Sequence, residues 1–137
     1  MYLDGNIFKL NQFATSLSDV TNQDTFVIAR VAEIFEYNEK KQKTDKVIGA
    51  RYDLNVITGG NFTLKVTDAA PLITPEKLAN RQELDIQTLL AVDTSKVTIK
   101  PYDVVMRDGY LMGVKVSIST TPDAVELAEP VETLGTK

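Results

Sequence analysis

Four lysines stand close together in one short polar segment, and their type and spacing suggest a specific chemistry. The segment spans residues 38–46, and its basic side chains are Lys40, Lys41, Lys43 and Lys46. Only Glu39 and Asp45 oppose them within the segment. Clustered ammonium groups neutralise phosphates, so this pattern is typical of a loop that contacts a polyanion. A solvated, charged hairpin loop without a ligand is the alternative interpretation.

Further polar and aromatic residues fall where a neighbouring groove would need them. The polar ones, on strand positions expected to face outward, are Arg30, Arg51, Asn55, Lys65 and Lys115. Singly, such residues are ordinary surface, but together they would form a groove if they shared one face. Tyr37 and Tyr110 lie near expected strand ends and are the aromatics best placed to stack on bases, an interaction worth about 1–3 kcal/mol per base. Tyr52 and Phe62 alternate with apolar residues and are expected in the core.

The residues that most catalytic and metal sites use are missing. The chain has no Cys and no His, which excludes disulfides, thiolate nucleophiles and the commonest general base. The carboxylates are scattered and form no metal-binding pattern. We therefore expect no enzymatic activity, no catalytic residue, no metal and no cofactor. A nuclease that binds Mg²⁺ through carboxylates alone is the enzymatic alternative.

Net charge and its distribution constrain the class of partner. The chain has 137 residues, a size that suits one domain, and its formal net charge is −4. Residues 1–120 carry 14 basic and 15 acidic side chains, while residues 121–137 carry four acids against one lysine. Because the local field decides where an anion binds, this acidic total is compatible with a basic binding loop.

The N-terminal residues indicate the expected location. No basic segment followed by an apolar run begins the chain, and no stretch approaches the roughly 18 apolar residues needed to cross a bilayer. We therefore expect a cytoplasmic protein with no membrane contact.

Alternating apolar residues predict three strands in the first half of the chain. Residues 26–37 are rich in β-branched and aromatic residues and predict a long strand, bulged where alternation is imperfect; an amphipathic helix is the alternative. Residues 47–57 and 62–67 alternate more clearly. Residues 58–61 contain two glycines and predict the tight turn between these two strands.

The second half predicts one helix and one hairpin. Thr74 and Pro75 are typical of an N-cap and a first helical residue, so a helix is expected from there to about residue 82. Residues 97–106 and 110–119 predict two strands joined by a turn at Asp108-Gly109. Pro101 requires an edge or a bulge.

The two ends of the chain differ from the central domain expected at residues 25–120. Residues 1–24 predict an N-terminal arm whose exposed apolar residues would pack on this domain or on a neighbouring copy. The arm residues expected to mediate oligomerisation are Tyr2, Ile7, Phe8 and Phe13. Residues 121–137, with two prolines and no aromatic residue, predict a flexible acidic tail.

The predicted order is three strands, one helix and two strands. This order predicts a mainly β protein with a five-stranded, OB-fold-like barrel and one helix between strands 3 and 4. A general α+β meander is the alternative.

A family resemblance agrees with this order. The run from Val27 to Val66, the helix start at residues 74–78, and residues 97–102 followed by a Gly-containing hairpin resemble the OB-fold single-stranded DNA-binding proteins of Gram-positive conjugative plasmids and integrative elements, and related phage proteins. The resemblance covers about residues 25–120. It implies sequence-tolerant binding of single-stranded DNA in plasmid conjugation or replication, with several copies along one strand. The chain departs from ordinary bacterial single-strand-binding proteins because it lacks Trp and an Asp-Phe-rich acidic tip.

Two hypotheses about function follow. In the first, the protein binds single-stranded DNA and forms homo-oligomers through the N-terminal arm. In the second, it is a β-rich assembly or adaptor protein of a phage or secretion apparatus, without a role in nucleic-acid binding.

Overall fold

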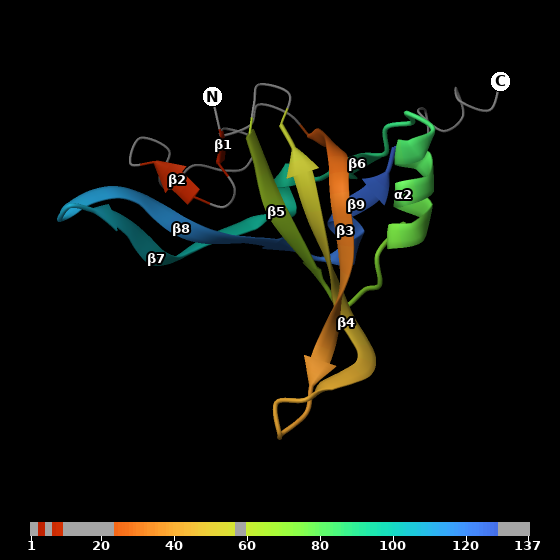
Figure 1. Ribbon diagram of the computed structural model, residues 1–137, viewed down its shortest axis with the longest axis horizontal. Helices are drawn as coiled ribbons and strands as arrows, with labels where there is room; N and C mark the ends of the chain where they lie inside the picture. Colours follow the sequence, from red (N-terminus) through yellow and green to blue (C-terminus); the bar gives the residue numbers. More distant parts are fainter. Residues whose placement is uncertain (1–2, 5–6, 10–23, 57–59, 129–137) are drawn as a thin grey trace.

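A computed structural model describes residues 3–4, 7–9, 24–56 and 60–128 (Figure 1). Its strands are β1 (Leu3–Asp4), β2 (Ile7–Lys9), β3 (Thr25–Tyr37), β4 (Lys43–Asn55), β5 (Gly60–Thr67), β6 (Leu89–Val92), β7 (Thr98–Arg107), β8 (Tyr110–Thr120) and β9 (Val125–Leu127). One α-helix, α2 (Pro75–Glu83), and two 3₁₀ helices, η2 (Thr94–Lys96) and η3 (Pro122–Ala124), complete the described elements. The fold is therefore mainly β, as predicted.

The described strands form one open, mixed sheet of nine strands, so the prediction of a five-stranded, OB-fold-like barrel is wrong. The strand order is β7-β8-β2-β1-β5-β4-β3-β6-β9, with an additional pairing between β8 and β5. All five expected strands are present, as β3, β4, β5, β7 and β8, and α2 follows β5. The sheet is open because its two end strands, β7 and β9, do not pair with each other among the described residues; β6 and β9 extend it beyond β3. Strands β6 and β9 were not predicted, because they are only four and three residues long.

Strand β3 is extended over 13 residues, which excludes the helical alternative for residues 26–37. Its register with β4 shifts between Ile28 and Arg30 and again near Phe35, so the expected bulges are confirmed. Beyond the body of the sheet, β3 and β4 continue together as a long hairpin, which Figure 1 shows projecting from the rest of the molecule.

Apolar residues that alternate along β4 and β5 form the centre of the core. Tyr52 and Phe62 are each only 1% exposed, which confirms their predicted burial. The Phe62 ring packs edge-to-face on Phe26 with a centroid separation of 5.1 Å. The Tyr52 hydroxyl accepts a hydrogen bond from the Leu72 backbone N–H at 2.9 Å, and burial raises the pKa of this phenol. The buried Tyr52 hydroxyl thus has a hydrogen-bond partner.

Helix α2 begins where the sequence predicts it. The Thr74 hydroxyl accepts a hydrogen bond from the Lys77 backbone N–H at 3.2 Å, and Pro75 occupies the first helical position. Leu78 is buried against the core, and the Gln82 side-chain amide donates to the Ala29 carbonyl of β3 at 3.0 Å. These contacts attach the helix beside β3.

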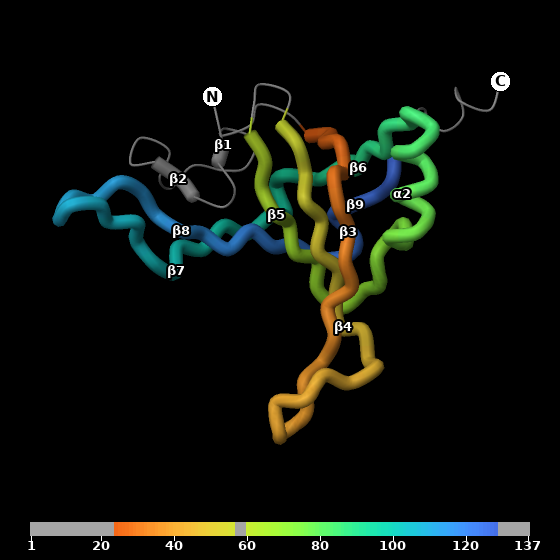
Figure 2. The backbone as a smooth tube through the Cα atoms, viewed as in Figure 1, coloured from red at the N-terminus to blue at the C-terminus, as the bar shows by residue number. Residues whose placement is uncertain are grey.

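The β7–β8 hairpin also matches its prediction. Asp108 and Gly109 have φ values of 53° and 81°, the left-handed conformations that a two-residue hairpin turn requires. Pro101 lies on a strand at the end of the sheet order, next to a register shift, as expected. In Figure 2 this hairpin and the β3–β4 hairpin extend from the body in different directions.

The ends of the expected central domain need correction. Residues 122–127 form η3 and β9, and β9 pairs with β6, so the flexible tail predicted from residue 121 does not begin there. Residues 129–137 lie outside the described residues. In the expected N-terminal arm, β1 pairs with β5, and β2 pairs with β8.

An ion pair holds η3 beside η2. Lys96 Nζ lies 2.9 Å from Asp123 Oδ2, and the Thr121 hydroxyl donates to the other carboxylate oxygen. The Thr121 hydrogen bond, followed by that from Lys96, lowers the pKa of Asp123 from 3.8 to about 2. The carboxylate therefore stabilises the folded state in its charged form.

We expect the Asp123 contribution to depend on pH. Because the folded-state pKa is depressed, the stabilisation is present above about pH 4 and is lost as the pH falls towards 2. Urea unfolding should show that Asp123→Asn is less stable than wild type at pH 6. The difference should shrink at pH 3, and an equal difference at both pH values would contradict this assignment.

Gly49 offers a test of the β4–β5 packing. A Cβ atom at this position would lie 2.7 Å from the Val66 carbonyl oxygen, which is closer than non-bonded atoms approach. Gly49→Ala should therefore lower the free energy of unfolding by about 1–3 kcal/mol, as overpacking does elsewhere. Chemical denaturation measures the change, and unaltered stability would show that the strands are not packed this closely.

Candidate polyanion-binding face

The register of β3, β4 and β5 brings most of the predicted strand residues onto one surface. Arg51 pairs with Lys65, and Asn55 pairs with Asn61, across β4 and β5. Arg30 on β3 pairs with Asp53, which lies between Arg51 and Asn55 on β4. Paired residues point to the same side of a sheet. We call this surface, opposite the buried side chains, the outward face.

The outward face is exposed and slightly hollowed. A depression of about 370 Å³ is lined by Arg30, Val31, Ala32, Arg51, Asp53 and Thr63. A second depression of about 270 Å³ adjoins it and adds the amide side chains of Asn55 and Asn61. The surface therefore offers guanidinium, ammonium and amide groups together, which suits a phosphate backbone and the polar edges of bases.

Asp53 organises the centre of this face. Its Oδ2 atom lies 3.6 Å from Arg30 Nε, and its Oδ1 atom accepts a hydrogen bond from the Thr63 hydroxyl at 2.9 Å. The Arg30 side chain is 81% exposed, whereas that of Asp53 is 33% exposed. The Asp53 carboxylate thus lies beside the Nε atom of Arg30, and most of the Arg30 side chain stays open to solvent.

Strand β8 carries the fourth predicted cation, Lys115, on the same side. Lys65 pairs with Ser119, and alternation along β8 places Ser117 and Lys115 on the side of Ser119. Ser117 pairs with the exposed Lys100 of β7. Lys100 was not predicted, because only the strand pairing, and no local motif, places it beside this surface.

The lysine loop forms a well-defined turn at the tip of the β3–β4 hairpin. The Asn38 side-chain oxygen accepts hydrogen bonds from the backbone N–H groups of Lys40 and Gln42, at 2.9 and 3.0 Å. Lys41 adopts a positive φ of 61°. All four loop lysines are exposed.

The loop is less basic in three dimensions than its sequence indicates. Lys46 Nζ lies 3.7 Å from Glu36 Oε2, and Lys43 Nζ lies 4.1 Å from the centroid of the Phe35 ring. Within residues 33–46, four lysines face four acids, because Glu33 and Glu36 come from the adjacent strand. Lys43 is also about 26 Å from Arg51 along β4, at roughly 3.3 Å per residue. The loop and the outward face therefore carry two separate sets of cations.

The two tyrosines predicted to stack on bases lie away from the outward face. Tyr37 pairs with Lys43 near the tip of one hairpin and is 65% exposed. Tyr110 pairs with Arg107 at the tip of the other hairpin and is 73% exposed. Both are accessible, but the structure does not bring them together.

The predicted oligomerisation residues are only partly described. The register of β2 with β8 pairs Ile7 with Lys115 and Phe8 with Val114 of the same chain. Tyr2 and Phe13 lie outside the described residues. The backbone of Ile7 and Phe8 is thus already paired with β8 of the same chain.

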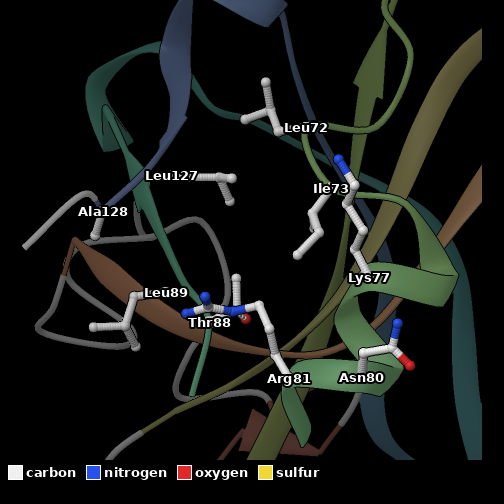
Figure 3. Close-up of a pocket in the computed structure, with 9 residues that line it drawn as sticks. All are labelled: Leu72, Ile73, Lys77, Asn80, Arg81, Thr88, Leu89, Leu127 and Ala128. Carbon is white, nitrogen blue, oxygen red and sulfur yellow. Dashed lines mark hydrogen bonds between the residues drawn. The ribbon is translucent and has the colours of Figure 1, made fainter. Parts of the chain in front are cut away.

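A larger cavity lies on another side of the molecule, between α2, β6 and β9 (Figure 3). Its volume is about 470 Å³, and its walls combine apolar residues, including Leu72 and Leu127, with Lys77 and Arg81. Arg81 Nε donates to the Thr88 hydroxyl at 2.7 Å, and a terminal nitrogen donates to the Gln87 carbonyl at 3.2 Å. This arginine therefore fixes the segment between α2 and β6.

Comparison with known proteins assigns no family. No family model matches the chain, and searches of curated proteins and of solved structures found no significant similarity. In the described part of the chain, no three acidic, His or Cys side chains are placed to hold a metal ion. No α-helix within those residues is long and apolar enough to span a membrane. The geometry of the outward face therefore carries the functional argument.

Asp53→Asn should strengthen polyanion binding if the outward face is the binding surface. The substitution removes a negative charge beside Arg30 and keeps an oxygen that can accept the Thr63 hydrogen bond. We expect the affinity for oligo-dT to rise about twofold to fivefold, the usual range for one exposed charge. Fluorescence anisotropy measures this change, and an unchanged or weaker affinity would place the binding surface elsewhere.

Proposed function

We propose that this protein binds single-stranded DNA with little sequence preference, through the outward face of β3, β4 and β5. The observation that carries the proposal is the convergence of Arg30, Arg51, Asn55 and Lys65 on that face. Exposed cations neutralise the backbone, and amides beside them can bond to base edges without selecting one sequence.

The lysine loop contributes a second set of backbone contacts. Lys40 and Lys41 are exposed at the tip, whereas Lys43 and Lys46 already have partners in Phe35 and Glu36. A strand that crosses the outward face along β4 reaches this tip after about 26 Å. Such a length fits within the 4–16 nucleotides that a small β-domain typically covers. We therefore assign the outward face the larger share of the affinity.

The sequence resemblance to single-stranded DNA-binding proteins of conjugative plasmids supports a proposal for the biological setting. The proteins that this chain resembles coat single-stranded DNA in plasmid conjugation or replication, and we propose the same role here, with several copies along one strand. We place this activity in the cytoplasm.

The direct test compares oligo-dT binding by two charge-removing variants with that of one control variant. Arg51→Ala combined with Lys65→Ala should weaken oligo-dT binding and reduce the log–log salt slope by about 1.4, since each phosphate contact on a single strand contributes about 0.7. Replacing all four loop lysines by Ala should give a smaller loss of affinity, because Lys43 and Lys46 already contact Phe35 and Glu36. Lys77→Ala on α2 removes an exposed lysine that lines the separate cavity, and it should change neither quantity.

Three results would contradict the proposal. The first is wild-type protein that fails to bind oligo-dT at low salt. The second is an Arg51→Ala/Lys65→Ala variant that retains the wild-type slope. The third is Lys77→Ala losing as much affinity as the double variant, which would indicate unspecific attraction. Parallel titrations with duplex DNA and single-stranded RNA define the preferred form.

An assembly or adaptor role is the second candidate, and the apolar surface of the β7–β8 hairpin favours it. Tyr102, Val104 and Met106 are 67%, 48% and 55% exposed on β7. This candidate requires concentration-dependent association that does not respond to added oligonucleotide. Sedimentation with and without oligo-dT therefore separates the two functions.

A further inference from the structure

Strand β7 ends the sheet with a backbone edge that has no strand partner among the described residues. Large apolar side chains surround this edge: Val104, Met106, Leu111 and Met112 are 48%, 55%, 43% and 49% exposed. Contiguous exposed apolar surface of this kind marks interaction sites, and an open strand edge is a ready template for another strand.

The backbone orientation along β7 follows from its pairing with β8. Arg107 and Tyr110 flank the two-residue turn, so the peptide groups of Arg107 and Val105 face β8. Those of Val104 and Met106 then face away from β8. In agreement, the Val104 N–H donates to the carboxylate of Asp103 at 2.8 Å.

The free edge of β7 is regular between its two register shifts. The register passes from Pro101–Val116 to Asp103–Lys115, which leaves Tyr102 as an extra residue on β7. It later passes from Val105–Gly113 to Met106–Leu111, which leaves Met112 as an extra residue on β8. Residues 103–107 of β7 therefore run without an interruption of their own.

We propose that two copies of this protein join edge to edge through β7, antiparallel, about a two-fold axis at Val105. In this register, Val104 lies opposite Met106 of the second copy, and both carry outward-facing peptide groups. The two-fold axis generates two such Val104–Met106 pairs. Each pair exchanges two backbone hydrogen bonds, which makes four in all. A two-fold axis makes the contact self-complementary and closed, so it yields a dimer and no filament.

Charge selects this register among the antiparallel alternatives. Asp103 lies directly opposite Arg107 of the second copy, and Arg107 lies opposite the partner Asp103. Arg107 makes no ion pair within the described part of the chain. On forming the dimer, the Asp103 carboxylate leaves the Val104 N–H, which then donates to the carbonyl of Met106 across the axis.

Apolar burial accompanies the ladder. Val104 pairs with Val114, and Met106 pairs with Leu111, so Val104, Met106 and Leu111 share one side of the hairpin. The two copies bring these side chains together across the axis. Their exposed area is roughly 300 Å² per copy, against roughly 800 Å² in a standard interface, so a weak dimer with a dissociation constant in the micromolar range is expected.

This dimer stands independently of nucleic-acid binding, and it uses a different surface from the N-terminal arm. It also places the outward faces of both copies on the same side of one continuous sheet, because a two-fold axis between antiparallel strands is perpendicular to the sheet.

A charge exchange tests the register. Arg107→Asp places Asp opposite Asp at both contacts, and Asp103→Arg places Arg opposite Arg, so each variant alone should dimerise at least about tenfold more weakly than wild type. An equimolar mixture of the two variants restores opposite charges at both contacts and should recover dimers. Sedimentation velocity up to about 200 µM measures the association, a range that brackets the expected constant. Monomeric wild type, full dimerisation of either variant alone, or no recovery in the mixture would overturn the proposal.

A single cysteine provides a second test that does not depend on the charged residues. The chain has no Cys, and Val105 would face itself across the axis with Cα atoms about 4.5 Å apart, within disulfide range. Val105→Cys should form an intermolecular disulfide under mild oxidation faster than the control Ser117→Cys, whose exposed position lies away from the axis. Equal rates for the two variants would place Val105 outside the interface and contradict the proposal.

Discussion

Apolar and polar residues alternate along β4 and β5, and this alternation determines both the core and the surface opposite it. Burial of Tyr52, Phe62 and their alternate neighbours stabilises the core by roughly 1.5–3 kcal/mol per large side chain. The same alternation requires Arg51, Asn55 and Lys65 to point the other way. A register slip of one residue would bury these polar groups, so core packing also fixes the candidate binding surface.

Two long hairpins extend from the body of the sheet and carry two different kinds of exposed residue (Figure 1). The β3–β4 hairpin carries the lysine loop away from the body, while the β7–β8 hairpin carries an apolar edge (Figure 1). Because the hairpins point in different directions, contacts to a polyanion and contacts to a second copy need not compete. The net charge of −4 does not oppose this arrangement, since the cations on the outward face act locally.

Much of this organisation was predictable from sequence, and the misses have physical causes. The alternation of residues 47–67, the Thr74 cap and the Asp108-Gly109 turn are local signals, and each identifies its element correctly. Non-local pairing leaves no such signal, so β6, β9 and the open form of the sheet were missed. For the same reason, the sequence overstated the charge of the lysine loop, because Glu36 approaches Lys46 only when the hairpin forms. Lys100 was missed because its neighbour Ser117 lies on another strand.

We propose that the outward face of β3, β4 and β5 is one contiguous surface that contacts single-stranded DNA. Backbone amide chemical shifts of labelled protein, followed during a titration with oligo-dT, test it most directly. We expect saturable shifts centred on Arg30, Arg51, Asn55 and Lys65, extending towards Lys40 and Lys41, with α2 unaffected. Shifts confined to α2 or to the β7–β8 hairpin, or no shifts at low salt, would contradict it.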